Sequence, residues 1–256
     1  MAIARPYHRN WRPMKEGKSG TAYLIDKAYA DSPIHYIRAF ELIQSDFKKL
    51  IEYVEPSTDS IKTYSYRIHE LLMRTCIEVE ANFKAILLEN GYQPTLSKND
   101  QPIMNMSIYH KIEMTHHLSS YQVVLPTWNG DERIWKPFAA WKNGNGNPEW
   151  YNAYNQSKHD RQDSFKKANM ESLINAVSGL LVVLSSQFGT QDFSPSAISF
   201  GISGDEYEYY DLEAAIGGYF RIGFPDDWDE EEKYDFDWSV LKTSSTRFQK
   251  FNYNKS

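Results

Sequence analysis

The feature that most constrains the fold is an apolar stripe between residues 169 and 188. Its side chains recur at steps of three and four residues, namely Met170, Leu173, Ile174, Val177, Leu180, Leu181, Leu184 and Phe188. This spacing places them on one face of an α-helix that Gly189 ends, and such a face has to be covered by other apolar surfaces. The longest apolar run, 173–184, is too short to span a bilayer. We therefore expect a helix of a packed bundle and no membrane span.

Three earlier segments have the same helical periodicity, and they cover residues 32–54, 60–90 and 148–167. Ser32 is placed to cap the first of them, with Pro33 at the first helical position and Pro56 beyond its end. Short turns between helices favour antiparallel packing. The sequence therefore predicts a mainly α fold, a bundle of at least four helices.

Two regions do not fit this periodicity. Residues 92–147 form an irregular, aromatic-rich insertion with one short strand-like run, YQVVLP. After residue 190, the runs AISFGIS and GGYFRIGF are short, β-like and separated by glycines, so they could pair as a hairpin. We therefore predict a helical bundle with an N-terminal arm over 1–190 and a small β-containing extension with an acidic tail over 191–256.

Charge and cysteine content restrict the function classes. The net charge of −6 argues against nucleic-acid binding over the whole surface, although it leaves room for a local basic patch. Much of the negative charge lies in 226–238, where interleaved aromatics suit either a solvated loop or docking of a basic protein partner. The single cysteine, Cys76, fits a reducing compartment, and residues 1–20 lack the apolar run of a signal peptide. We expect a cytoplasmic protein.

The segment NQSKHDR, residues 155–161, is the strongest candidate site. On a helix, Asn155 and His159 share one face, Asp163 extends it, and Lys158 and Arg161 flank it. A histidine suits general acid–base catalysis near neutral pH, and an arginine can grip a phosphate with two hydrogen bonds. No well-placed serine or cysteine nucleophile accompanies them, so the set suits phosphodiester cleavage better than acyl transfer. The alternative is a solvated charged face of an amphipathic helix.

This segment also resembles a family motif. In the HEPN superfamily of helical-bundle proteins, an Arg, often followed by Asn, precedes a His by four to six positions on a late helix. The run YNQSKH aligns Asn155 with that Asn and His159 with that His, but Tyr154 stands where the Arg is expected. The apolar helix after the motif and the long earlier helix with embedded Arg and Glu are also similar. The resemblance covers roughly residues 60–190, interrupted by the aromatic insertion.

Many HEPN proteins are RNA-cleaving toxins or defence effectors that act as dimers. The resemblance therefore implies metal-independent RNA cleavage through attack by the 2′-hydroxyl, without a cofactor, in a homodimer of a toxin–antitoxin or phage-defence system. His159 would act as general acid or base with Asn155 and Arg161 beside it. Lys158, Tyr154 and Arg74 would contact substrate, and a cation among them would replace the missing Arg. The alternative is a non-catalytic relative that binds RNA, a nucleotide, or a protein through 226–238.

Two further clusters have weaker patterns. His110, Glu113 and His117 are spaced to share a helix face, with His116 adjacent, and could ligate the metal of a hydrolase. A polar helix face explains the same pattern, and we expect no metal in the functional site. A ladder of charges on the second helix, made of Arg67, Glu70, Arg74 and Glu78, is typical of ion pairs that support a helix.

Overall fold

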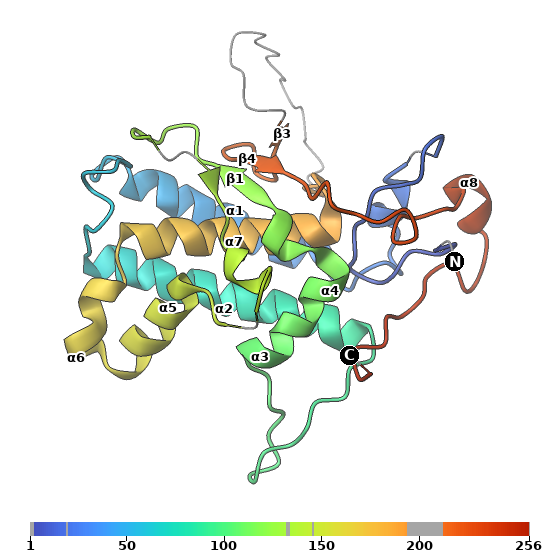
Figure 1. Ribbon diagram of the computed structural model, residues 1–256, viewed down its shortest axis with the longest axis horizontal. Coiled ribbons are helices and arrows are strands. Elements are labelled where there is room, and N and C mark those ends of the chain that lie inside the picture. Colours follow the sequence, from blue (N-terminus) through green and yellow to red (C-terminus); the bar gives the residue numbers. More distant parts are fainter. Residues whose placement is uncertain (1–2, 19, 132–133, 145, 194–211, 256) are drawn as a thin grey trace, which may run out of the picture.

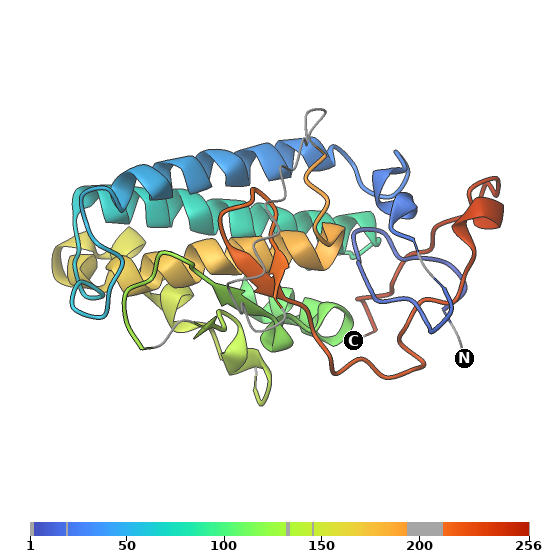
Figure 2. The ribbon, with the colours of Figure 1, turned by 90° about the horizontal axis from the view of Figure 1, so that it is seen from above.

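The computed structural model describes residues 3–18, 20–131, 134–144, 146–193 and 212–255. Four longer helices form its body: α1 (Pro33–Leu50), α2 (Tyr66–Glu89), α5 (Glu149–His159) and α7 (Met170–Phe188). Helices α1, α2 and α7 run side by side along the long axis of the molecule (Figures 1 and 2). The predicted mainly α fold is confirmed, with a small antiparallel sheet added to it.

Helix α7 is the centre of the bundle. It packs against α1, α2 and α5, and every residue of its predicted apolar stripe is fully buried. It is long and apolar enough to cross a membrane, but nearly all of it is covered by the other elements. The side chain of Asn169 caps its start by accepting a hydrogen bond from the backbone N–H of Ser172, and Gly189 follows its end. The stripe thus organises the core, as the sequence predicts.

The start of α1 differs in detail from the prediction. Pro33 occupies the first turn as expected, but Ser32 adopts the left-handed conformation (φ 50°) and its side chain makes no capping bond. Its hydroxyl donates instead to the carboxylate of Asp31. Helix α2 has the regular arrangement, since Ser65 accepts from the backbone N–H of Ile68.

The predicted helix 148–167 is broken in the middle. Helix α5 ends at His159, and Asp160 leaves helical geometry with φ −137° and ψ 75°. The Asp160 carboxylate then accepts from the backbone N–H of Asp163 and caps a new short helix, α6 (Arg161–Ser164), followed by a 3-10 turn, Phe165–Lys167. Aspartate competes in this way with the helical hydrogen bonds of the chain. The prediction that Asp163 extends the face of Asn155 and His159 is therefore wrong.

A four-stranded antiparallel sheet lies against the bundle, in the order β2-β1-β4-β3. Its strands are β1 (Gln122–Val124), β2 (Ile134–Trp135), β3 (Glu213–Ala214) and β4 (Arg221–Gly223). β1 comes from the aromatic insertion and pairs with β4 from the C-terminal region, with Val123 opposite Ile222. β4 lies within the predicted run GGYFRIGF, whereas its predicted hairpin partner, AISFGIS, lies outside the described residues.

The insertion is partly helical. It contains α3 (Met106–Tyr109) and α4 (Glu113–His116), joined and followed by the 3-10 turns His110–Ile112 and Leu118–Ser120, and a further 3-10 turn, Ala139–Trp141. Asn105 caps α3 by accepting from the backbone N–H of Ile108. These short elements cover one side of α2 with aromatic side chains, among them Tyr109, which stacks on Phe83 at 5.2 Å between ring centroids.

The two chain ends lie toward the same end of the bundle, as do the 3-10 turn Ala22–Ile25 and the short helix α8 (Trp238–Leu241) (Figure 2). The backbone N–H of Tyr7 donates to the hydroxyl of Tyr234, which in turn donates to the carbonyl of Asn10. The ring of Tyr7 also meets that of Phe251 edge-on. The predicted boundary at residue 190 therefore separates segments that share one sheet and one set of end contacts.

Candidate functional site

A polar cavity of about 400 Å³ lies where α5 faces α2 and the start of α3. Its polar lining includes Glu80, Asn105, Asn147, Tyr151, Asn155 and Lys158. Two of the sequence-predicted site residues, Asn155 and Lys158, thus lie on the wall of one cavity. The other polar groups come from three separate segments of the chain.

The packing of α5 explains this arrangement. Its inward face, which includes Trp150, Ala153, Tyr154 and Ser157, is buried, and α5 packs on α7 and α2. The indole N–H of Trp150 donates to the carbonyl of Pro137 at 2.8 Å and fixes the start of the helix. Tyr151, Asn155 and Lys158 follow one another at steps of four and three residues, so they lie along the adjacent face, which borders the cavity.

Glu80 and Tyr151 join the two helices across the cavity wall. The Tyr151 hydroxyl donates to Oε1 of Glu80 at 2.9 Å. Burial, and then the charge of Glu80, raises the pKa of Tyr151 well above its ordinary value, so the hydroxyl keeps its proton. The Glu80 side chain is 20% exposed, and the one ion pair that it forms within the described residues is long, 3.7 Å to Nζ of Lys84. A carboxylate therefore faces the cavity with lone pairs to spare.

Lys158 contributes the positive charge of the site. Its Nζ donates to the Tyr154 hydroxyl at 3.2 Å and lies 5.2 Å from the centre of that ring. The hydrogen bond to Tyr154 raises the pKa of Lys158, so the ammonium is charged at neutral pH. Tyr154 itself is only 1% exposed and supports Lys158 from below. This burial leaves almost none of the Tyr154 surface open for the substrate contact that the sequence predicts.

His159 is the last residue of α5 and is exposed to solvent. Within the described part of the chain it makes no hydrogen bond or ion pair, and it lies outside the lining of the cavity. It directly follows Lys158 at the end of the helix, and its side chain leaves the axis about 100° around from that of the lysine. An imidazole exposed in this way is open to contact with a ligand.

The two predicted arginines lie apart from the cavity lining. Arg161 is exposed on α6, with its guanidinium 5.7 Å from the ring centre of Tyr66. Arg74 is bound to the carboxylate of Asp46 at 2.5 Å and lines a different cavity, of about 300 Å³, between α1 and α2. The structure therefore places Asn155 and Lys158 on the wall of one cavity, and it leaves His159, Arg161 and Arg74 outside that lining.

No protein-family model, curated protein or solved structure matches the chain. The chemistry of the site itself therefore has to indicate the function.

Sequence reasoning missed four of the cavity residues, namely Glu80, Tyr151, Asn105 and Asn147. In the sequence, Glu80 stands four positions before Lys84, a spacing typical of an ion pair on a solvated helix face. Its signal in the sequence is its position beside Cys76 and Val79, which belong to the buried stripe of α2. A carboxylate at the border of such a stripe is partly desolvated and needs a partner, which α5 provides.

The predicted metal face of the insertion is not formed. Among the residues that the structure describes, no group of three His, Cys, Asp or Glu side chains could hold a metal ion. His117 adopts the left-handed conformation (φ 50°) and ends α4 at His116, which breaks the helix face that the spacing predicted. Glu113 instead accepts from the hydroxyl of Ser119, and His110 contacts the carbonyl of Gly144.

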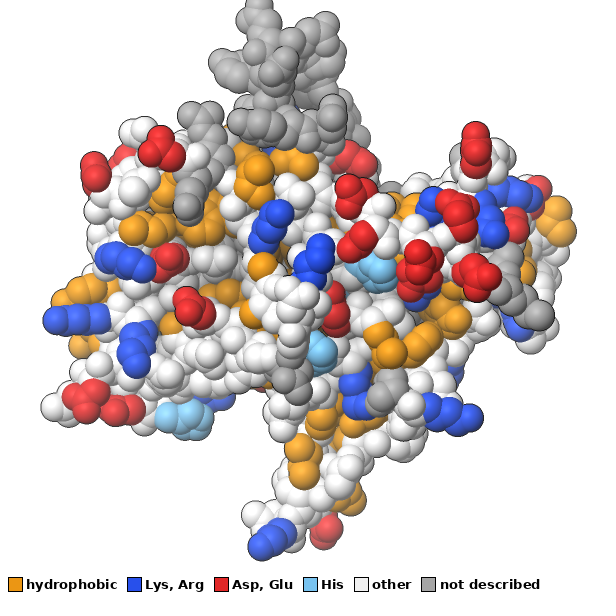
Figure 3. Space-filling view, in the orientation of Figure 1, with side chains coloured by type: hydrophobic (Ala, Val, Ile, Leu, Met, Phe, Trp, Pro, Cys, Tyr) orange, Lys and Arg blue, Asp and Glu red, His pale blue; other side chains and the backbone are white. Residues whose placement is uncertain are grey.

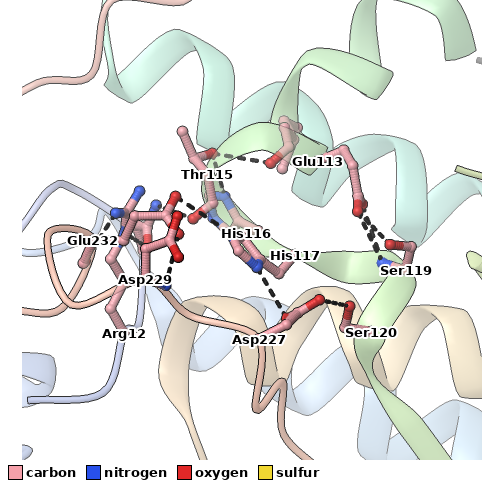
Figure 4. A network of polar contacts seen from close by, with 12 residues as sticks. Arg12, Glu113, Thr115, His116, His117, Ser119, Ser120, Asp227, Asp229 and Glu232 are labelled. Atoms are coloured by element: carbon pink, nitrogen blue, oxygen red, sulfur yellow. Dashed lines mark hydrogen bonds and ion pairs between the residues drawn. The ribbon is translucent and has the colours of Figure 1, made fainter. Parts of the chain in front are cut away.

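His117 instead contacts the acidic segment 226–238. Its ring stacks on Trp228 at 4.0 Å, and its nitrogens lie 3.1 Å from Asp227 and 3.4 Å from Glu232 (Figure 4). Trp228 and Phe236 are buried within the molecule. Carboxylates of the segment, among them Asp226, Asp229 and Glu230, remain exposed, and red side chains gather at this end of the face in Figure 3.

Proposed function

We propose that the chain binds single-stranded RNA along α5 and cleaves it without a metal ion, with His159 as the general acid or base. The observation that carries the proposal is the exposed imidazole of His159, which has no hydrogen-bond or ion-pair partner among the described residues and follows the charged Lys158 in the chain. Lys158 lines a polar cavity of about 400 Å³. This volume lies in the range of small-molecule sites and suits one nucleotide of a strand.

Each residue has a role that follows from its position. Lys158 holds the phosphate as a point charge, and Asn155 donates or accepts at the sugar or base inside the cavity. Arg161, two residues beyond His159 and exposed, neutralises charge that develops on the phosphate oxygens. Arg74 has no part in this step because it is bound to Asp46 in a separate cavity.

The reaction is an internal transfer of the phosphate. The RNA 2′-oxygen attacks the adjacent phosphorus and loses its proton to a base, while the bond to the 5′-oxygen breaks and that oxygen takes up a proton from an acid. The products are a 2′,3′-cyclic phosphate and a free 5′-hydroxyl. One imidazole fills one of the two proton-transfer roles at a time. The proposal therefore includes a homodimer in which His159 of a second copy fills the other.

The experiment compares His159→Ala with His35→Ala, a control at an exposed histidine of α1. Each protein is incubated with a single-stranded RNA and with the same strand carrying 2′-deoxyribose, in the presence of EDTA. We expect the wild type and the control to cut only the RNA and the His159 variant to be slower by about 10²-fold or more. Unchanged cleavage by a folded His159→Ala variant contradicts the assignment.

A second candidate is a non-catalytic RNA- or nucleotide-binding protein of the same helical class. It is favoured by the burial of Tyr154, the residue at the position where the HEPN pattern has Arg. It predicts that the wild type binds the RNA and the deoxy-substituted strand alike and cuts neither. Failure to bind either strand would contradict both candidates. The resemblance to HEPN proteins stays a prediction, and RNA cleavage is the property by which this experiment tests it.

A further inference from the structure

The cavity beside α5 carries two opposite charges at different places. Lys158 stands on its wall with an ammonium whose contacts within the described residues are the hydroxyl and ring of Tyr154. Glu80 stands on the wall formed by α2, with its carboxylate fixed by the Tyr151 hydroxyl at 2.9 Å. The two side chains form no ion pair within 4.0 Å in the described structure, although the charge of Glu80 still acts on Lys158 through space. A matching ligand has an anionic group at one end and N–H donors at the other.

A nucleotide has this distribution of groups when its base carries an amino group. Its phosphate meets the ammonium of Lys158, and its base offers N–H donors to the carboxylate of Glu80. Asn105, Asn147 and Asn155 line the same cavity, and their amides can complete the hydrogen bonding of a base edge or a ribose. Met104 and Met106, also in the lining, supply soft apolar surface for the face of the base.

We infer that this cavity binds one nucleotide and selects bases with an amino group, which are adenine, cytosine and guanine, against uracil. The selection comes from Glu80. Uracil presents a single N–H between two carbonyl oxygens, and a carboxylate repels those oxygens, whereas an amino group donates to it directly. The inference deepens the proposed RNA-binding function by naming the nucleotide class that enters the site.

Tyr151 is the positioning residue of this selection. Its hydroxyl donates to one oxygen of Glu80 and fixes the direction of the carboxylate without neutralising its charge. Each carboxylate oxygen has two lone pairs, so Glu80 can accept from Tyr151 and from a base at once. Burial and the nearby carboxylate keep the Tyr151 hydroxyl protonated, so it remains the donor that orients Glu80.

The test measures binding of AMP, CMP, GMP and UMP, as 3′-monophosphates, to the full chain by calorimetry. For the wild type we expect the three amino-bearing nucleotides to bind about tenfold more tightly than UMP. In Glu80→Gln the new amide can donate to a uracil carbonyl, so the preference should fall to about twofold or less. Glu70→Gln, at an exposed position of α2 outside this cavity, should keep the wild-type preference.

Tyr151→Phe provides a further readout that a merely structural role of Glu80 would not produce. It should weaken binding of the three amino-bearing nucleotides more than that of UMP, so the preference narrows but keeps its order, since the carboxylate remains but is less well oriented. Equal binding of the four nucleotides by the wild type, or no binding at all, overturns the inference. So does an unchanged preference in a folded Glu80→Gln variant, as judged by circular dichroism.

Failure of this inference and failure of the proposed cleavage can be told apart. Amino-selective nucleotide binding without RNA cleavage supports the cavity and contradicts the catalytic role of His159. Cleavage of RNA without any base preference supports His159 and contradicts the role of Glu80.

Discussion

Nε2 of His116 lies 2.9 Å from the backbone carbonyl oxygen of Arg9, so helix α4 is bonded directly to the N-terminal arm. Nδ1 of the same ring lies 2.7 Å from the Thr115 hydroxyl, which also contacts the hydroxyl of Tyr253. Because a carbonyl oxygen can only accept, we assign the neutral tautomer whose proton is on Nε2 and donates to Arg9. The imidazole is fully buried and joins three distant segments of the chain.

Because of this histidine, the free energy of unfolding should decrease as the pH falls. Burial lowers the pKa of His116 from 6.5 to about 3 in the folded protein. Below pH 6.5 the unfolded chain therefore takes up a proton that the folded protein refuses. The stabilising effect is complete above pH 6.5 and is lost as the pH falls towards 3, by up to about 1.4 kcal/mol per pH unit.

Urea unfolding between pH 4 and pH 7 checks this prediction. In His116→Gln the amide can still donate to the carbonyl but does not titrate, so the free energy of unfolding should depend less steeply on pH. His159→Gln, at an exposed histidine, should keep the wild-type slope. Parallel slopes for the wild type and His116→Gln would contradict the assignment.

Arg9 should be critical for folding. Its fully buried guanidinium donates to Glu89 at 2.6 Å, to Gln187 at 2.9 Å and to the carbonyl of Asp31, and it lies 4.6 Å from the ring centre of Tyr36. Arg9→Met leaves these acceptors without a donor, so we expect a loss of about 3 kcal/mol in chemical denaturation. Arg67→Met removes an exposed pair and should change little. Similar losses in both variants would refute a special role for Arg9.

Gly179 should resist substitution although it lies inside helix α7. An added Cβ would stand 3.1 Å from Cζ2 of Trp150, whose ring is held by its bond to Pro137. Gly179→Ala gains about 1 kcal/mol of helix propensity, but overpacking against a fixed indole costs more, so we expect a net loss of about 1–2 kcal/mol.

The neighbouring Ser178→Ala is the matched control for thermal unfolding. The Ser178 hydroxyl is buried without a hydrogen-bond partner among the described residues, so its removal should stabilise the protein by about 1 kcal/mol. Stabilisation by Gly179→Ala would show that Trp150 moves aside.

The phosphate contact of Lys158 should be visible in the salt dependence of RNA binding. The logarithm of the binding constant falls linearly with the logarithm of the salt concentration. The slope of this line should be smaller in magnitude by about 0.7 in Lys158→Ala, the value for one phosphate contact on a single strand. Lys27→Ala, at an exposed site far along the chain, should leave the slope unchanged. An equal slope in Lys158→Ala and wild type would exclude a phosphate contact by this lysine.

The sequence predicted the helices well where their signals are local. The spacing from Met170 to Phe188 repeats every helical turn, and a buried face of this kind can be recognised without knowledge of what covers it. The break at Asp160 is local too, but there the capping preference of one side chain outweighs the periodicity around it. Asn155 and Lys158 were found because both lie on one helix.

Only the tertiary structure decided which residues accompany them. Glu80 and Tyr151 are 71 positions apart in sequence, and His116 and Arg9 are 107 apart, yet each pair is hydrogen-bonded. Helical periodicity reports whether a face is apolar, and the sequence by itself therefore determined the bundle and its central helix. Partners of a buried polar group depend on which faces meet after packing, so the cavity and the buried histidine became visible only in the folded chain.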